Sequence, residues 1–362
     1  MGDEIVVKWY ETNKTKYALA GALFGVCFPV VAVSIDIIRL GLAFTWANII
    51  WVQLEFPIHL IIDTAPFFLG LFALIGGIRQ DKIEILNARL LYKIGVQELE
   101  LQVSTEDLEA SKLLRLKMAS ELNIARDIQL SMLPLEFPAF PHRNDVDVYA
   151  ALLPAKAVGG DFYDFFFLDE EHLCFVVGDV SGKGVPAALV MAECKTLIKS
   201  HAPLQKSTAE VLTQVNYEMA LHNQNYMFVT VFMGILNTKT GVLNYTNAGH
   251  NPTIIRKQDG STQKLKELHG PVVAAVEDFK YKETTTQLEK GDVIFAYTDG
   301  VTEAHNAQNQ MFTYNRLEEM LKAPFANVAI TVDTIIEAVK SFEDGRESFD
   351  DITAICLEYI GE

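Results

Sequence analysis

The residues of this chain best suited to chemistry are aspartates that stand at the ends of strand-like runs. Gly-Asp turns at Asp161 and Asp179 bracket two apolar runs, 162–168 and 173–177. This order predicts a β-hairpin with one carboxylate at each outer end. Because a carboxylate at the end of a buried strand is costly to desolvate without a positive charge beside it, we expect a metal ion there.

Further aspartates occupy turns elsewhere in the chain: Asp164, Asp299, Asp350 and Asp351. A single Asp-Gly turn is most often a solvated turn. Strand-end acids from separate parts of a chain can, however, converge at one edge of a layered domain. Hard divalent ions such as Mg²⁺ and Mn²⁺ prefer oxygen ligands and retained waters. The residues alone therefore favour two-metal activation of water against a phosphate or similar ester.

Charge, loop spacing and cysteine placement exclude other classes of function. The net charge of −17 makes nucleic-acid binding unfavourable. The glycine-rich stretch 178–184 is one residue too short for a nucleotide-binding P-loop, and Gly184 replaces the required Ser or Thr. The four cysteines are far apart and lie in apolar contexts, so we interpret all of them as buried, reduced thiols.

Two apolar stretches in the first third predict a pair of transmembrane helices, at about 17–38 and 56–78. Basic residues precede the first stretch and follow the second, which places both ends in the cytoplasm. A buried helical pair of a soluble domain is the alternative. Asp63, inside the second stretch, is either a sensing group or a residue of the outer interface. We expect a multi-pass protein of the inner (cytoplasmic) membrane.

The segment 79–133 is rich in Leu, Glu, Lys, Arg and Gln and contains no proline, which predicts a long helix that ends before Pro134. Several apolar residues share one seven-residue phase: Ile94, Leu101, Leu108 and Leu122. This phase favours a parallel coiled coil and a homodimer, although Arg115 interrupts it. The alternative is an amphipathic helix that only separates the membrane from the next domain.

Residues 134–362 combine many short strand patterns with a few helices, which is typical of an α+β layered domain. Strands are predicted at 146–153, 162–168, 173–177, 228–236, 242–245, 253–256, 281–288, 292–297 and 354–359. Helices are predicted at 186–199, 207–222 and 328–342.

Six stretches in this order resemble the motifs of the SpoIIE/RsbU family of bacterial protein phosphatases, the bacterial branch of the metal-dependent PPM phosphatases: 125–134, 158–164, 178–188, 247–252, 297–303 and 349–354. The apolar first third of the chain lies outside the region of resemblance. The resemblance implies an α-β-β-α sandwich with Mn²⁺ or Mg²⁺ at one edge of the central sheets. It also implies removal of phosphate from a serine or threonine, typically on a small anti-sigma-factor antagonist.

The resemblance assigns a set of metal ligands: Asp161, Asp179, the Val180 carbonyl, Asp299 and Asp350, with Asp164 and Asp351 as alternates. Asp179 would bridge two ions, and Asp299 and Asp350 would hold one ion each. Asp179 and Asp299 are therefore the expected catalytic residues. The nucleophile would be a water activated by both ions.

One departure from the family concerns the proton donor. Eukaryotic relatives have Asp-Gly-His-Gly where this chain has Asp-Val-Ser-Gly from Asp179, so the histidine proposed there as the general acid is absent. The sequence names no replacement. Lys156 and Lys183 either stabilise phosphate charge or are ordinary surface lysines. His250 is expected to be a structural residue of its turn.

The sequence thus predicts a membrane-anchored protein-serine/threonine phosphatase with a membrane region (1–78), a signalling helix (79–133) and a cytoplasmic catalytic domain (134–362). Its expected partners are a phosphorylated protein, a second copy of the chain and the lipid bilayer. A receptor or scaffold that binds a phosphoprotein without turnover is the alternative. A phosphatase of small phosphate esters is a third possibility.

Overall fold

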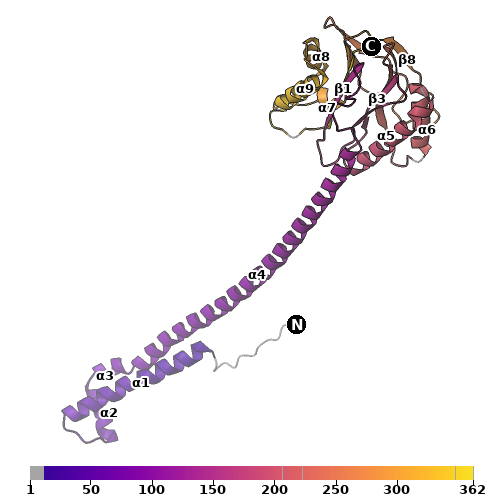
Figure 1. The fold of residues 1–362 in the computed structure, drawn as a ribbon. Helices are drawn as coiled ribbons and strands as arrows, with labels where there is room; N and C mark the ends of the chain where they lie inside the picture. Colours follow the sequence, from indigo (N-terminus) through magenta and orange to yellow (C-terminus); the bar gives the residue numbers. More distant parts are fainter. Residues whose placement is uncertain (1–11, 206, 222, 347, 362) are drawn as a thin grey trace. The chain divides into compact units, whose positions relative to one another are not determined.

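The computed structural model describes residues 12–205, 207–221, 223–346 and 348–361. The chain divides into two compact units, Met1–Leu113 and Leu114–Glu362. Each unit has its own buried apolar cluster: a small one around Ile37 and Val52 in the first, and two extensive ones in the second. Figure 1 shows the elements of both.

The described part of the first unit is helical. Its elements are α1 (Asn13–Arg39), α2 (Trp46–Glu55), α3 (Ile58–Ile62) and the first part of α4 (Ala65–Ser131). Two helical stretches are long and apolar enough to cross a membrane, Asn13–Arg39 and Ile58–Ser131, and their apolar windows are only 11% and 6% buried. This low burial is unlike that of a soluble core helix and suits lipid-facing surfaces.

The second predicted span has different bounds in the structure. Instead of one helix over 56–78, the short α3 ends at Ile62 and α4 begins at Ala65, just before Pro66. Proline is accepted in the first turn of a helix but not in its interior, which explains the new start. Asp63 lies at this break and accepts a hydrogen bond from Gln53 of α2.

Close packing joins α1 to the start of α4. A Cβ atom added at Gly25 would lie 2.4 Å from Cα of Pro66, so only glycine permits this approach. His59 of α3 is buried, and its Nε2 lies 3.0 Å from the Asp36 carboxylate of α1. The expectation that every cysteine is buried is wrong for Cys27, which is exposed on α1; the other three are buried and free.

The predicted linker helix is confirmed as the continuation of α4, which runs without a break to Ser131. The heptad residues Ile94, Leu101 and Leu108 are 49–69% exposed in the single chain. Such exposure leaves an apolar seam available to another helix. The helix ends shortly before Pro134, as the sequence predicts.

The second unit contains two five-stranded antiparallel sheets. The first has the order β1-β10-β9-β6-β7 and the second β2-β3-β4-β5-β8. The strands are β1 (Val146–Leu153), β2 (Phe162–Phe167), β3 (His172–Val180), β4 (Val229–Asn237), β5 (Val242–Ala248), β6 (Thr253–Arg256), β7 (Thr262–Leu265), β8 (Thr284–Gln287), β9 (Asp292–Tyr297) and β10 (Ile352–Tyr359).

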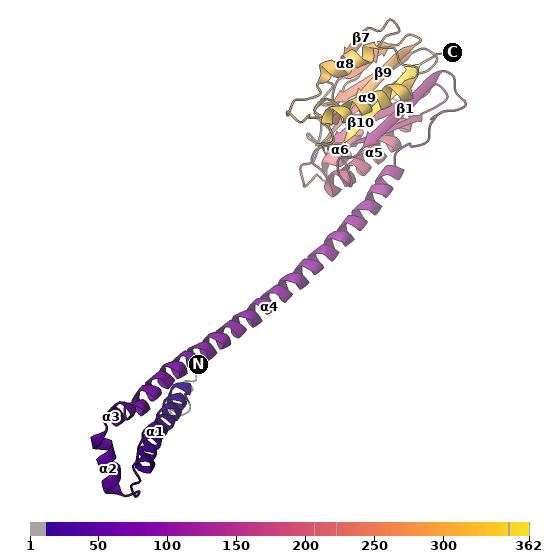
Figure 2. The same cartoon turned by 90° about the vertical axis from the view of Figure 1, so that its left-hand side faces the viewer.

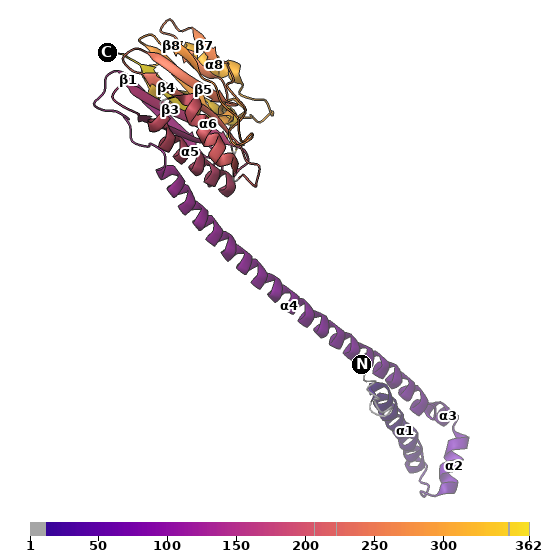
Figure 3. The same ribbon diagram turned by 90° about the vertical axis from the view of Figure 1, so that its right-hand side faces the viewer.

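Helices cover the outer faces of both sheets and complete an α-β-β-α sandwich. The helices α8 (Tyr314–Lys322) and α9 (Val328–Glu343) lie over the sheet of β1, β10 and β9 (Figure 2). The helices α5 (Val185–Gln205) and α6 (Thr208–Leu221) lie over the sheet of β3, β4 and β5 (Figure 3). The predicted fold class is therefore confirmed.

The continuous apolar runs of the central strands follow from this layering. Every residue from 173 to 178 in β3 and from 231 to 236 in β4 is buried, because one face meets the other sheet and the opposite face meets helices. Along α9 the buried residues Val328, Val332, Ile335 and Val339 follow the helical period. Three short elements of the second unit were not predicted: β7, α8 and the single turn α7 (Asp299–Thr302).

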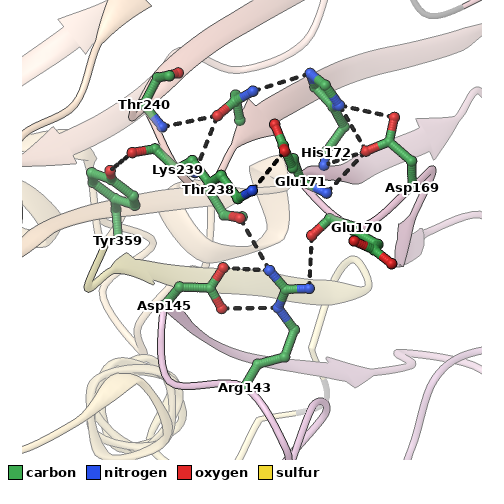
Figure 4. A network of polar contacts seen from close by, with 11 residues as sticks. Arg143, Asp145, Asp169, Glu170, Glu171, His172, Thr238, Lys239, Thr240 and Tyr359 are labelled. Carbon is green, nitrogen blue, oxygen red and sulfur yellow. Dashed lines mark hydrogen bonds and ion pairs between the residues drawn. The ribbon is translucent and has the colours of Figure 1, made fainter. Parts of the chain in front are cut away.

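A polar network fastens the two sheets to each other at one end of the sandwich (Figure 4). Arg143 donates to both carboxylate oxygens of Asp145, to the carbonyl oxygen of Glu170 at 2.9 Å and to the hydroxyl of Thr238 at 3.1 Å. The hydrogen bond from Arg143 lowers the pKa of Asp145. Because Glu170 follows β2 and Asp161 precedes it, the aspartate cluster lies at the opposite end of this strand.

Candidate metal centre

Four separate segments bring aspartates to one end of the two sheets. Asp161 immediately precedes β2 and Asp179 lies near the end of β3; the pairing of Phe162 with Gly178 sets these two aspartates side by side. Asp299 begins α7 directly after β9. The pair Asp350 and Asp351 immediately precedes β10, which is paired with β9 in the other sheet.

Two threonines join Asp161 to the opposite sheet. Its Oδ2 accepts hydrogen bonds from the hydroxyls of Thr298 and Thr353, each at 2.6 Å. Thr298 follows β9 and Thr353 lies in β10, whereas Asp161 belongs to the hairpin of the other sheet. All three side chains are buried, so these bonds fix the carboxylate in one orientation.

Asp351 holds the loop that precedes Asp161. Its Oδ1 accepts from the backbone N–H of Ala155 and its Oδ2 from that of Gly160, both at 2.8 Å. A Cβ atom added at Gly300 would lie 2.0 Å from the carbonyl oxygen of Asp351, so the α7 turn needs glycine to approach this closely. With both oxygens engaged, Asp351 is better suited to positioning the loop than to binding an ion.

Asp350 is more open and has a cationic partner. Its Oδ2 lies 2.9 Å from the Lys183 ammonium, and its side chain is 34% exposed. Lys183 also lies 3.9 Å from the ring centroid of Phe349 and donates to the carbonyl oxygen of that residue at 2.5 Å. The lysine is therefore part of the cluster's rim and not a detached surface residue.

Burial and mutual repulsion raise the pKa values of the aspartates in this cluster. Burial raises the pKa of Asp161 well above its usual value, and the charges of Asp179 and Asp351 raise it further. Burial raises the pKa of Asp179 to about 7, with further contributions from Asp299 and Asp350. Burial, followed by the charge of Asp350, raises the pKa of Asp299 to about 6. Crowded, partly buried carboxylates of this kind are stabilised by a cation.

The donor set fits hard divalent ions. Its side chains offer only oxygen, the donor that Mn²⁺ and Mg²⁺ prefer. Among the described residues, no group of three or more His, Cys, Asp or Glu side chains could hold an ion by itself. Mg²⁺ is typically held by one or two carboxylates, and waters fill its remaining positions.

Two sequence candidates lie outside the cluster. Asp164, predicted as an alternate ligand, is buried against the ammonium of Lys195 on α5. His250 is buried in its turn, where Nδ1 contacts the Thr230 hydroxyl at 2.9 Å and the backbone N–H donates to Asn247 Oδ1 at 2.7 Å. The structural role expected for His250 agrees with these contacts.

Three residues that the sequence reasoning missed also shape the site: Thr298, Thr353 and Gln129. Gln129, near the end of α4, donates to the carbonyl oxygen of Gly159 at 2.7 Å and accepts from its N–H at 3.2 Å. Gln129 belongs to the stretch 125–134 that resembles a family motif, but no sequence pattern indicates which of its side chains reaches the glycine loop. The threonines had no signal beyond their place next to strand-end aspartates.

The sequence and fold of this chain are similar to those of known proteins. The family model described as Stage II sporulation protein E (SpoIIE) matches residues 169–360. Phosphoserine phosphatase RsbU of Bacillus subtilis is 30% identical over 242 residues, covering 67% of this chain and 70% of RsbU. The chain belongs to the SpoIIE family. Protein IcfG of Synechocystis sp. is 30% identical over 308 residues, or 78% of this chain, but the chain spans only 47% of IcfG.

Solved structures show the same fold for this SpoIIE-family domain. The SiaA-PP2C domain of Pseudomonas aeruginosa has a TM-score of 0.60 at 20% identity and covers 68% of this chain and 98% of its own. The PP2C phosphatase domain of Bacillus subtilis SpoIIE, with a fragment of its regulatory domain, has a TM-score of 0.52 at 20% identity. The match covers 59% of this chain and 61% of the SpoIIE chain.

The SpoIIE-family domain thus has the fold of PP2C phosphatase domains, and its relative RsbU is named a phosphoserine phosphatase. Phosphatases of the PP2C class use Mn²⁺ or Mg²⁺. The oxygen-rich aspartate cluster at the sheet ends is compatible with that requirement.

Proposed function

We propose that this protein is a membrane-anchored, Mn²⁺- or Mg²⁺-dependent serine/threonine protein phosphatase. Its substrate would be a small phosphorylated regulatory protein, an anti-sigma-factor antagonist. The observation that carries the proposal is the meeting of Asp161, Asp179, Asp299 and Asp350, from four separate segments, in a family of serine phosphatases. RsbU, which shares 30% identity, is named a phosphoserine phosphatase.

Each aspartate has its own task in this proposal. Asp179 would bridge two ions with help from the Val180 carbonyl, Asp299 and Asp350 would hold one ion each, and Asp161 would complete the oxygen set. When bound, the ions supply Lewis-acid activation of water and neutralise phosphate charge. The protein contributes rigidity, because the hydroxyls of Thr298 and Thr353 hold the Asp161 carboxylate in place.

Lys183 and Ser181 have roles that differ from those of a general acid. The Lys183 ammonium beside Asp350 is suitably placed to attract the phosphate group. Ser181, which replaces the histidine of eukaryotic relatives, accepts a hydrogen bond from the Phe228 N–H at 2.9 Å and ties the segment after β3 to the start of β4. We therefore assign no side chain as proton donor to the leaving serine.

The proposed domain boundaries are 1–78 for the membrane region, 79–133 for the linker and 134–362 for the catalytic domain. Two apolar helical stretches support an inner-membrane anchor with the catalytic domain in the cytoplasm. The exposed heptad residues of α4 support a homodimer. Gln129 supports signal transfer along the linker, because it contacts the backbone of Gly159, two residues before Asp161.

The direct test is phosphate release by the whole chain in detergent micelles, with p-nitrophenyl phosphate and with a phosphoserine protein or peptide. We expect turnover that requires Mn²⁺ or Mg²⁺ and falls by roughly 100-fold or more in Asp179→Asn, because the ion-holding carboxylate is lost. The matched control is Asp278→Asn, which neutralises an exposed aspartate.

Each rival function predicts a different result. A scaffold would bind the phosphoprotein, measured by calorimetry, yet release no phosphate with either ion present. A phosphatase of small esters would turn over p-nitrophenyl phosphate efficiently and the phosphoprotein poorly. Unchanged turnover in Asp179→Asn would contradict the assignment of the site.

A further inference from the structure

A large cavity lies beside the aspartate cluster. Its volume is about 720 Å³, and its lining includes Lys156, Lys183, His305, Glu343, Arg346 and Phe349. These residues come from the loop after β1, the segment after β3, the loop after α7 and the segment that follows α9. The cavity therefore gathers side chains from four parts of the chain that are distant in sequence.

Two contacts link the lining of the cavity to residues of the proposed metal centre. Lys183 lines the cavity and also forms the ion pair with Asp350 at 2.9 Å. Lys156 follows Ala155, whose N–H donates to Asp351. A chain segment whose phosphate lay at the aspartates would thus have its neighbouring residues at the cavity wall.

The cavity is basic in a strongly acidic protein. Within the described residues Lys156 makes no ion pair, and Arg346 donates only to the carbonyl oxygens of Asn306 and Ala307, which leave its charge intact. The acidic lining residue Glu343 is 4% exposed and accepts from the Ser348 hydroxyl at 2.8 Å. The charges that reach the open cavity are therefore mainly positive, although the chain carries −17 overall.

The size of the cavity favours a peptide over a single ion. A water molecule occupies roughly 30 Å³, so about 720 Å³ holds several side chains. Phe349 contributes an apolar wall that is 73% exposed, which is suited to packing against a peptide. Long cationic side chains next to such a wall can bind carboxylates while the ring covers the intervening peptide.

We infer that this cavity is a substrate subsite that binds acidic residues flanking the phosphoserine of the protein substrate, with Lys156 and Arg346 as its selecting cations. The inference rests on the proposed function, since it specifies which phosphoproteins the same site prefers. Acidic flanks would match the basic cavity and would also keep a substrate oriented toward the metal centre.

Peptide selectivity of the whole chain in detergent, with Mn²⁺, tests this subsite. One phosphoserine peptide carries glutamates on both sides of the phosphoserine, and its partner carries glutamines at the same positions. The wild-type protein should prefer the glutamate peptide in kcat/KM. In Lys156→Glu this preference should fall by roughly three- to tenfold, because attraction becomes repulsion at an exposed site.

Lys266→Glu is the matched control. Lys266 is exposed, lies outside the cavity and undergoes the same change of charge, so its variant should keep the wild-type preference. Turnover of p-nitrophenyl phosphate, which has no flanking residues, is measured in all three proteins to correct for folding and for any general change in catalysis, so that the readout is the glutamate-to-glutamine ratio alone. An unchanged glutamate-to-glutamine preference in Lys156→Glu would overturn the inference.

A binding measurement separates this inference from the proposed function. The same peptides with unphosphorylated serine bind without turnover and can be followed by fluorescence anisotropy. Tighter binding of the glutamate peptide, weakened in Lys156→Glu but not in Lys266→Glu, would support the subsite even if no substrate were hydrolysed. Absence of hydrolysis would then count against the proposed function alone, and equal binding of both peptides would count against the subsite.

Discussion

At the scale of single residues, the ion pair of Asp164 and Lys195 is the most deeply buried charged contact described in the catalytic unit. Their side chains are 2% and 5% exposed, and Lys199 lies 3.5 Å from the same carboxylate oxygen. Asp164 also accepts the N–H of Phe165 at 2.9 Å. Removing one charge leaves the other desolvated and unpaired, which costs more than the pair itself contributes.

Asp164→Ala should therefore lower the free energy of unfolding by about 3–5 kcal/mol. The double variant Asp164→Leu/Lys195→Met should recover most of that loss, because it removes both buried charges. Thermal unfolding of the metal-free protein, followed by circular dichroism, measures the stability of the single and the double variant. Equal destabilisation in the single and double variants would show that packing, and not the unpaired charge, sets the cost.

The contrast between Asp161 and Asp164 shows how much of the site the sequence predicts. The Gly-Asp turns indicated a hairpin with Asp161 and Asp179 at its outer ends, and β2 does pair with β3 in this way, while the role of the two aspartates as ligands stays a prediction. Asp164 lies three residues further on, inside β2, where its carboxylate pairs with Lys195 of α5. No local spacing indicates that partner. The hydroxyl donors Thr298 and Thr353 could not be predicted, because their partner is fixed only by the packing of two sheets.

His250 gives the fold a pH dependence. Burial lowers its pKa from the usual 6.5 to about 4, so the folded protein keeps it neutral while the unfolded chain protonates it. Between pH 6.5 and 4 the unfolded state binds more protons, and stability falls as the pH falls. At pH 5 the loss is about 2 kcal/mol relative to pH 7.5.

His250→Asn should reduce this slope, even if it lowers stability at every pH. The measurement is chemical denaturation of metal-free wild type and variant at pH 7.5 and pH 5. For each protein, the readout is the free energy of unfolding at pH 7.5 minus that at pH 5. A loss of stability that is equal at both pH values therefore does not interfere. Identical pH slopes in both proteins would contradict the role of His250.

At the scale of elements, α4 is the helix that contacts the glycine loop of the site. Gln129 binds both backbone groups of Gly159, and Ile128 and Met132 lie with Leu189 of α5 around a small, largely apolar cavity of about 180 Å³. Such a lightly filled contact can be repacked at lower cost than a dense core. A rotation or shift of this end of α4 would therefore reach Gly159 directly.

Inserting residues after Ser111 tests the linker. One alanine turns the following helix by about 100°, whereas seven restore the heptad phase. We expect the one-residue insertion to change phosphatase activity severalfold and the seven-residue insertion to return it toward the wild-type value. Equal activity across the series would rule out signal transfer by helix phase.

The elements that the sequence predicted and those it missed differ in burial. Strands β1, β6 and β9 were predicted at their observed bounds, because apolar alternation or runs mark them clearly. Strand β7 is short and mostly polar, and it pairs only at the edge of its sheet. Helix α8 did carry a signal in the buried pair Leu317 and Leu321, spaced by four, but it was too short to stand out.

At the scale of the whole molecule, the proposed protein combines a membrane hairpin with a metal-dependent phosphatase domain. The apolar helices explain the high hydrophobic content of an otherwise acidic chain. The negative net charge in turn suits a protein whose active centre gathers carboxylates around cations. The family model matches residues 169–360 within the second unit, so both apolar helical stretches lie outside its match.

The most direct test of the central claim is calorimetric titration of the purified chain with Mn²⁺ at neutral pH. The account predicts two ions per chain for the wild type and for Asp278→Asn, with binding strongly weakened in Asp179→Asn. If the protein releases phosphate from phosphoserine while it binds no Mn²⁺ or Mg²⁺, or if Asp179→Asn binds two ions with unchanged affinity, these aspartates are not the metal centre.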